Sequence, residues 1–239
     1  MFPFGKQGKD SFYQKSTTAS GIPVVSSALV SDIALTKAKE IVEMMLEFRP
    51  DIGRQLARNA IKVAVMAESE QTTDIPEHSD LNRVFPIFDW NSRCRGVAAT
   101  IARPVCSVGE ENLLKKQTDR YIGSSVLIHE FAHTILITGI DTIKGGNTFR
   151  ERLMKSFERA KSNSLWEHTY AGTNVDEYWA VGAQAWFDAN VCSETPDGVN
   201  NHVNTREKLL DYDPALYGLL VEVLSPKYKW ISGDIRLIS

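Results

Sequence analysis

The segment SSVLIHEFAHTIL, residues 124–136, is the feature that most limits what this chain can fold into. Apolar side chains fill most of its positions, and the ionisable exceptions are His129, Glu130 and His133. Residues four apart on a helix project from the same face, so the two imidazoles would lie one turn apart and could share a metal ion. Burial of three unpartnered ionisable groups would be costly, and a bound metal would offset that cost. The segment therefore favours a zinc site.

Glu130 follows the first histidine directly. At that position a carboxylate can approach a metal-bound water without binding the metal, which suits a general base. The alternative is a buried helix whose histidines are satisfied by ordinary hydrogen bonds, because short motifs also occur by chance.

A catalytic zinc needs a third protein ligand and keeps one position for water. Glu177 lies 44 residues beyond His133, in the first turn of a helix predicted over residues 175–190. The small face formed by the residues that follow it would let this helix pack closely on the histidine helix. In another interpretation, Asn174 is the N-cap and Glu177 closes a capping box. Asp176 and His168 are alternative ligands.

An HExxH motif followed tens of residues later by a helical glutamate resembles the gluzincin class of zinc metallopeptidases. Within that class, the anthrax lethal factor catalytic domain and the clostridial Pro-Pro endopeptidases place a catalytic tyrosine seven residues before the glutamate, where this chain has Tyr170. The resemblance implies that the phenol stabilises the oxyanion of the transition state. Alternatively, Tyr170 is an aromatic residue packed at a helix entrance.

Residues 20–225 resemble a largely uncharacterised set of bacterial and other secreted-looking proteins, through TTDIPEH, GEENLL, LIHEFAH, EYWAVGAQAWFD and HVNTRE. This resemblance implies the same zinc site and a secreted or extracellular location, and it brings no known substrate. An acidic residue is usual in that set where this chain has Val181, which leaves open the partner of a ligand histidine's second ring nitrogen. Asp141 and Asp188 are the candidates.

The order of elements predicts an α+β fold. Residues 1–30, rich in Gly, Ser, Thr, Lys and Pro, predict an extended N-terminal arm, and residues 31–239 predict a single domain. Ser31 should cap a helix that Pro50 helps to end. A strand is expected at 61–67, on the edge or in the interior of the sheet, with shorter strands near 96–101 and 105–108. Helices are expected at 124–138, 148–161 and 175–190, with two more after residue 205. With the resemblance above, this is a zincin-like domain with a small mixed sheet followed by a helical C-terminal half.

The charges predict neither a nucleic-acid partner nor a membrane-binding patch, because 27 basic and 30 acidic residues are interspersed. No apolar run reaches the roughly 20 residues needed to span a bilayer. Cys94 and Cys106 would form one disulfide in an oxidising compartment, or stay reduced. His78 would contact substrate from a cleft loop or be solvated.

Zinc-dependent hydrolysis of a peptide or protein substrate is the expected function. His129, His133 and Glu177 would hold Zn²⁺, with Glu130 as general base and Tyr170 stabilising the oxyanion. One alternative is a non-catalytic peptide- or partner-binding protein on a zincin scaffold. Another is a structural site, which normally has four protein ligands.

Overall fold

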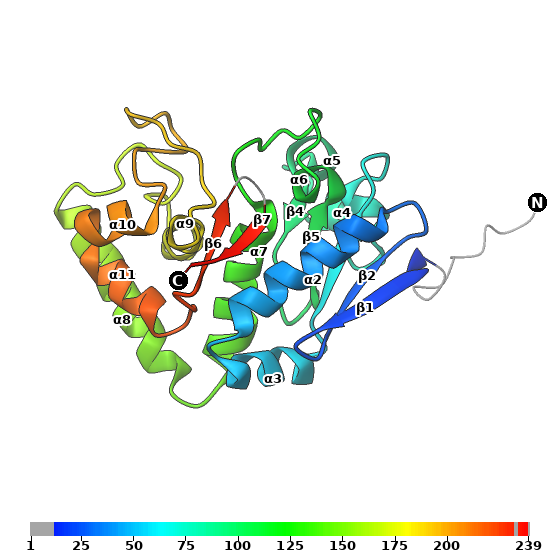
Figure 1. Cartoon of the computed structure of the whole chain (residues 1–239), viewed down its shortest axis with the longest axis horizontal. Coiled ribbons are helices and arrows are strands. Elements are labelled where there is room, and N and C mark those ends of the chain that lie inside the picture. The colour runs from blue at the N-terminus through cyan, green and yellow to red at the C-terminus, as the bar shows by residue number, and fades with distance from the viewer. Residues whose placement is uncertain (1–11, 232–233, 239) are drawn as a thin grey trace, which may run out of the picture.

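A five-stranded mixed sheet occupies the N-terminal half of the chain, and helices make up most of the rest (Figure 1). The computed structural model describes residues 12–231 and 234–238. The strands lie in the order β1-β2-β3-β5-β4, with β2, β3 and β5 parallel and the two outer strands antiparallel to their neighbours. The predicted α+β fold is therefore confirmed. The strands are β1 (Lys15–Ala19), β2 (Ile22–Ser26), β3 (Lys62–Met66), β4 (Gly96–Val97) and β5 (Val105–Gly109).

The helices predicted from the sequence are present, with ends that differ by a few residues, and four further α-helices of the described chain between residues 50 and 113 were not predicted. Ser31 caps α2, as predicted, because its hydroxyl accepts a hydrogen bond from the backbone N–H of Ile33 at 3.3 Å. Pro50 opens the next helix, in the first turn, where its missing N–H has no cost. The helices are α2 (Asp32–Leu46), α3 (Pro50–Arg58), α4 (Leu81–Val84), α5 (Trp90–Arg93), α6 (Glu110–Leu113), α7 (Val126–Thr134), α8 (Gly146–Ser162), α9 (Val175–Trp186), α10 (Arg206–Tyr212) and α11 (Pro214–Val221).

Short elements complete the described chain. Three 3₁₀ helices cover Thr72–Asp74, Pro76–His78 and Ile140–Thr142, and a π-helix over Ile135–Gly139 continues α7. The hairpin of β6 (Tyr228–Ile231) and β7 (Asp234–Leu237) was not predicted from the sequence. No helix in residues 12–231 or 234–238 is long and apolar enough to cross a bilayer.

The segment predicted as an arm contributes two strands to the sheet. Residues 15–26 form the hairpin β1–β2, which turns through Ser20 and Gly21 at φ values of 50° and 84°. Ala19, Ile22 and Val24 are fully buried there. Residues 1–11 lie outside the described residues, and the division into an arm and a domain at residues 31–239 stays a prediction.

Strand β3 lies inside the sheet, between β2 and β5. Of the two positions that the sequence left open for this strand, the interior one is therefore confirmed. The edge that faces the second half of the chain is β4, and α7 packs against both β4 and β5.

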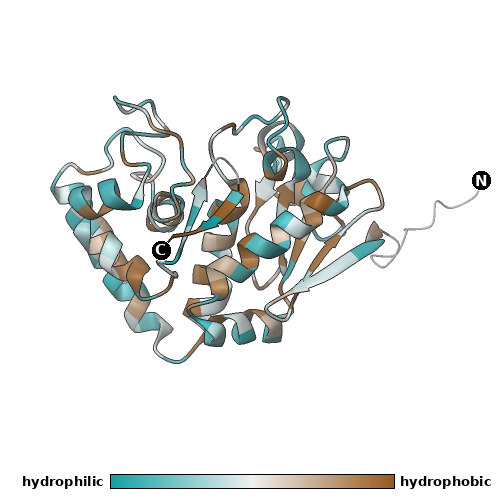
Figure 2. Cartoon of the chain, in the orientation of Figure 1, coloured by the Kyte–Doolittle hydropathy of each residue, from teal (hydrophilic) through white to brown (hydrophobic). Residues whose placement is uncertain are grey.

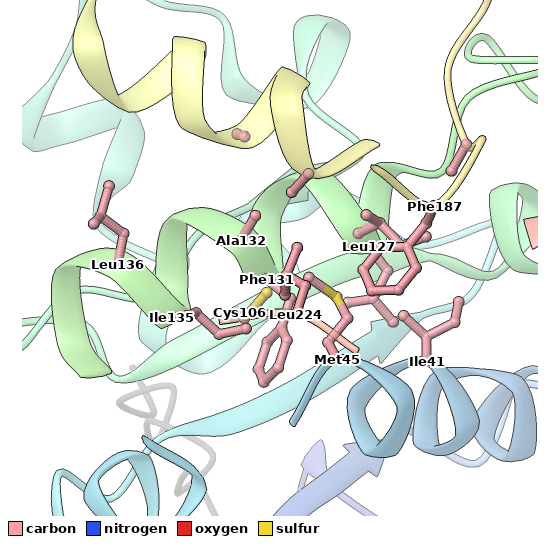
Figure 3. Packing of buried hydrophobic residues seen from close by; sticks show 14 of the residues in the cluster. Ile41, Met45, Cys106, Leu127, Phe131, Ala132, Ile135, Leu136, Phe187 and Leu224 are labelled. Atoms are coloured by element: carbon pink, nitrogen blue, oxygen red, sulfur yellow. The ribbon is translucent and has the colours of Figure 1, made fainter. Parts of the chain in front are cut away.

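Helix α7 runs through the middle of the molecule, between the sheet and α9 (Figure 1). Figure 2 shows apolar residues gathered in the inner strands of the sheet and in α7, with more hydrophilic residues in β1, in the loops and on parts of the outer helices. In Figure 3, Phe131 and Ile135 lie near Met45 of α2 and Cys106 of β5, and all four side chains are buried. Burial on these sides fixes the helix that carries the HExxH motif. Cys106 makes no disulfide with Cys94 in the described structure.

His78 is fully buried, so neither proposed interpretation of this residue is right. Its Nε2 lies 3.2 Å from the hydroxyl of Ser107 on β5, and its Nδ1 has no hydrogen-bond partner among the described residues. Burial lowers the pKa of His78 from 6.5 to about 4. The imidazole is therefore neutral near pH 7.

Acid should destabilise the fold through His78. Because the folded pKa of about 4 lies below the unfolded value of 6.5, the unfolded chain binds the proton first as pH falls through this window. The loss of unfolding free energy from this residue should be about 3 kcal/mol between pH 6.5 and pH 4. Denaturant unfolding of wild type and His78→Asn across this range should show a smaller pH dependence in the variant. His202→Asn, which removes an exposed histidine, is the control, and parallel curves for wild type and His78→Asn would contradict the prediction.

Candidate metal centre and active-site cleft

Helix α7 begins at a well-formed cap that orients the two histidines. The hydroxyl of Ser125, the N-cap, accepts a hydrogen bond from the N–H of Ile128 at 3.3 Å. His129 and Glu130 lie one turn after this cap, and His133 lies one turn after His129. His129 and Glu130 are the partly exposed residues of α7, and His133 is buried with the rest of the helix.

Helix α9 brings Glu177 to the histidines. The side-chain oxygen of Asn174, its N-cap, accepts hydrogen bonds from the N–H groups of Asp176 and Glu177, both at 3.0 Å. The indole of Trp179 donates to the carbonyl of Ala132 at 3.0 Å and ties α9 to α7. Asn174 is therefore the N-cap, whereas the carboxylate of Glu177 points to the histidines.

Three side-chain atoms converge between the two helices. Oε2 of Glu177 lies 3.0 Å from Nε2 of His129 and 3.2 Å from Nε2 of His133, and the two nitrogens are 3.1 Å apart. The three side chains are between 8% and 15% exposed. Bonds of about 2.1 Å to a tetrahedral zinc would separate such atoms by about 3.4 Å, so shifts of a few tenths of an ångström would admit the ion. The residues present therefore fit a zinc ion.

The electrostatics of this group favour a cation. Burial alone would raise the pKa of Glu177, but hydrogen bonds and charge from His129 and His133 hold it well below its usual range. Burial alone would lower the pKa of His129, but the carboxylate of Glu177 raises it. The carboxylate is therefore anionic, and two ring nitrogens face it. In the described residues, these three make up a group of side chains able to hold a metal ion, with ligand atoms within 4.8 Å of one another.

A cleft of about 730 Å³ opens beside this group, and Glu130, His129 and Tyr170 line it. The ring of Tyr170 stacks on that of His129, with centroids 6.0 Å apart and planes inclined by 26°. Burial and the negative charge of Glu177 raise the pKa of the Tyr170 phenol, which therefore keeps its proton near neutral pH. Glu130 does not belong to the three-residue group. The structure thus places both predicted catalytic side chains at the cleft beside the predicted ligands.

Gly96 on the edge strand β4 is a residue that the sequence analysis missed. A Cβ atom added there would lie 2.4 Å from Cγ1 of Val126 and 3.0 Å from Cγ of Glu130. A glycine in a strand often marks such a close approach, and this was the available signal. Gly96 allows the edge strand to pass directly beside the glutamate.

The other candidates lie elsewhere in the fold. Asp141 and Asp176 both pair with Arg150, and Asp188 pairs with Lys229 at 2.8 Å. His168 lies in a loop at a φ of 55° and does not join the group of possible metal ligands. A different residue contacts a ligand histidine: Oε1 of Gln184 on α9 lies 3.0 Å from Nδ1 of His129.

The comparison with known structures identifies the fold as zincin-like, as predicted. The chain is similar to the Pro-Pro endopeptidase PPEP-2 from Paenibacillus alvei, with a TM-score of 0.53 and 20% sequence identity. The match covers 84% of this chain and 97% of that one. No protein-family model matches the chain, and no curated protein matches it by sequence. The structural neighbour is a peptidase, and at this identity the likeness establishes the fold.

Proposed function

We propose that this protein is a gluzincin-like zinc peptidase that hydrolyses bonds in a peptide or protein substrate. The observation that carries the proposal is the triangle of His129, His133 and Glu177 atoms, 3.0 to 3.2 Å apart, at a cleft that also holds Glu130 and Tyr170. The fold of a Pro-Pro endopeptidase supports it. By resemblance to secreted-looking proteins, we propose an extracellular setting.

Each cleft residue has a distinct part in this chemistry. Zinc, when held by the three ligands, supplies a Lewis acid that acidifies water and polarises a carbonyl. Glu130 takes the proton of the attacking water and passes it to the leaving amine. Tyr170, which retains its proton, donates to the carbonyl oxygen as negative charge develops there.

The edge strand β4 offers a place for the substrate backbone. An extended peptide can add to a sheet edge through main-chain hydrogen bonds. Gly96 lies on that edge, and its α-carbon passes close to Glu130. A peptide paired with β4 would therefore run next to the general base.

Two other functions compete with this one. A non-catalytic binding protein would have no use for a general base, whereas Glu130 is present in the cleft. A structural zinc site normally has four protein ligands, and the group found in the described residues has three. Three ligands leave a position for water, as catalysis requires.

The test is metal content measured together with cleavage of a diverse peptide library. We expect one zinc per chain, cleavage that a chelator abolishes, and recovery when zinc is added back. Library members that bind without being cut would favour the binding protein. A folded chain that takes up no zinc would end the proposal.

Tyr170→Phe should lower kcat by about 100-fold, as removal of one oxyanion donor typically does. The ring and its stacking on His129 remain, so KM and zinc content should change little. Steady-state kinetics on a library-derived peptide measure both constants. Tyr217→Phe, which removes the hydroxyl of a ring that packs against Trp186, is the control. A change confined to KM would make Tyr170 a packing residue of the substrate site.

A further inference from the structure

The side chain of Gln184 contacts α7 at two places. It lies on α9, two turns beyond Glu177, and it is 6% exposed. Its Oε1 is 3.0 Å from Nδ1 of His129, and its Nε2 is 3.2 Å from the carbonyl oxygen of Ser125, the N-cap of α7. One side chain thus links the ligand-bearing α9 both to a ligand histidine and to the start of that histidine's own helix.

These two contacts determine where the imidazole proton resides. The carbonyl of Ser125 can only accept, so the end of the Gln184 amide that faces it is the NH₂ group. The end that faces His129 is then the amide oxygen, which also only accepts, so Nδ1 of His129 carries a hydrogen. A neutral imidazole has one N–H. The lone pair is therefore on Nε2, the atom that faces Glu177 and His133.

We propose that Gln184 is a positioning residue that holds His129 in the tautomer able to bind the metal, and that its neutral amide takes the place of a charged partner. This inference rests on the metal centre of the proposed function. Val181, one turn after Glu177, is 5% exposed and has no atom that can accept from the imidazole. Asp141 and Asp188 are engaged with Arg150 and Lys229. Gln184 is thus the partner of His129.

The neutral partner has a consequence for the charge of the site. An amide orients the ring without adding negative charge, so Glu177 is the anionic member of the ligand set. A carboxylate in place of the amide would accept the same hydrogen bond and attract the cation more strongly. Zinc affinity should therefore follow the hydrogen-bonding capacity and charge of residue 184.

Zinc affinity, measured by competition with a chelator, separates positioning from packing. Gln184→Leu keeps much of the volume and cannot accept a hydrogen bond, so zinc binding should weaken about 10- to 100-fold. Gln184→Glu keeps the acceptor for Nδ1 of His129 and loses the donor to Ser125, so it should bind zinc more tightly than Gln184→Leu. If the residue only packs, the order reverses, because leucine suits a buried site and glutamate does not. Gln55→Leu, on α3, is the matched control.

A second measurement determines directly which ring nitrogen of His129 carries the hydrogen. In the zinc-free protein at a pH where His129 is neutral, ¹⁵N NMR should show its hydrogen on Nδ1 in wild type and in Gln184→Glu, and a mixture of tautomers in Gln184→Leu. Hydrogen on Nε2 in wild type, or equal zinc affinity in Gln184→Leu, would overturn this inference alone. A chain that binds zinc and cleaves nothing would overturn the peptidase and leave the inference standing. No zinc binding by folded wild type would overturn both.

Discussion

Glu130→Gln is expected to keep zinc bound and to lower kcat by a factor of about 10³, within the range that general acid–base groups contribute. Glutamine has the shape of glutamate and lacks the basic oxygen that takes a proton from water. The side chain packs beside Gly96 on β4, and it lies outside the three-residue ligand group. The substitution should therefore remove one chemical step and leave the metal centre intact.

Zinc per chain and kcat on one library-derived peptide, measured for both proteins, test this expectation. Glu151→Gln, at an exposed position of α8, controls for the loss of one carboxylate. Turnover within a few-fold of wild type would exclude Glu130 as the base. Loss of zinc from Glu130→Gln would show instead that this carboxylate helps to hold the metal.

The parts of the site that the sequence predicted are those set by local spacing. His129 and His133 fall on one helix face because four residues make about one turn, and this holds wherever the helix packs. Glu177 could be proposed because Asn174 marks a helix start, and a residue in the first turn projects from a known position. Tyr170 came from resemblance to known peptidases and not from spacing alone.

The contacts that were missed depend on how distant elements pack. The hydrogen bond from His129 to Gln184 requires α9 to be rotated and shifted against α7 in one particular way, and a single sequence carries no signal for this. The approach of Gly96 to Glu130 likewise depends on the order of strands in the sheet. Both contacts join residues more than 30 positions apart.

Burial of polar segments also escaped prediction. The segment KSTTASGIPVVS contains many polar and turn-forming residues, which suggested an arm, yet it pairs with β3 as a hairpin. Its apolar residues are few, but Ile22 and Val24 occupy alternate positions of β2 and both are fully buried. His78 is buried by β5 and its surroundings, although the sequence around it reads as a loop. In each case tertiary packing outweighs local composition.

Glu177→Ala should weaken zinc binding by more than the roughly 100-fold that loss of a ligand's hydrogen-bonding partner costs, because it removes a ligand and the anionic charge of the group. The protein should stay folded, since the Asn174 cap bonds to backbone N–H groups and the Trp179 indole still bonds to α7. Competition with a chelator measures the affinity, and circular dichroism checks the fold.

Asp176→Ala is the matched control, because this neighbouring acid was the rival ligand and is paired with Arg150 in the structure. It should bind zinc as wild type does. Loss of zinc in Asp176→Ala and retention in Glu177→Ala would reverse the assignment. Retention of tight zinc in both variants would mean that no acid of α9 binds the metal, and the three-ligand centre, with the open position for water that it leaves, would have to be abandoned.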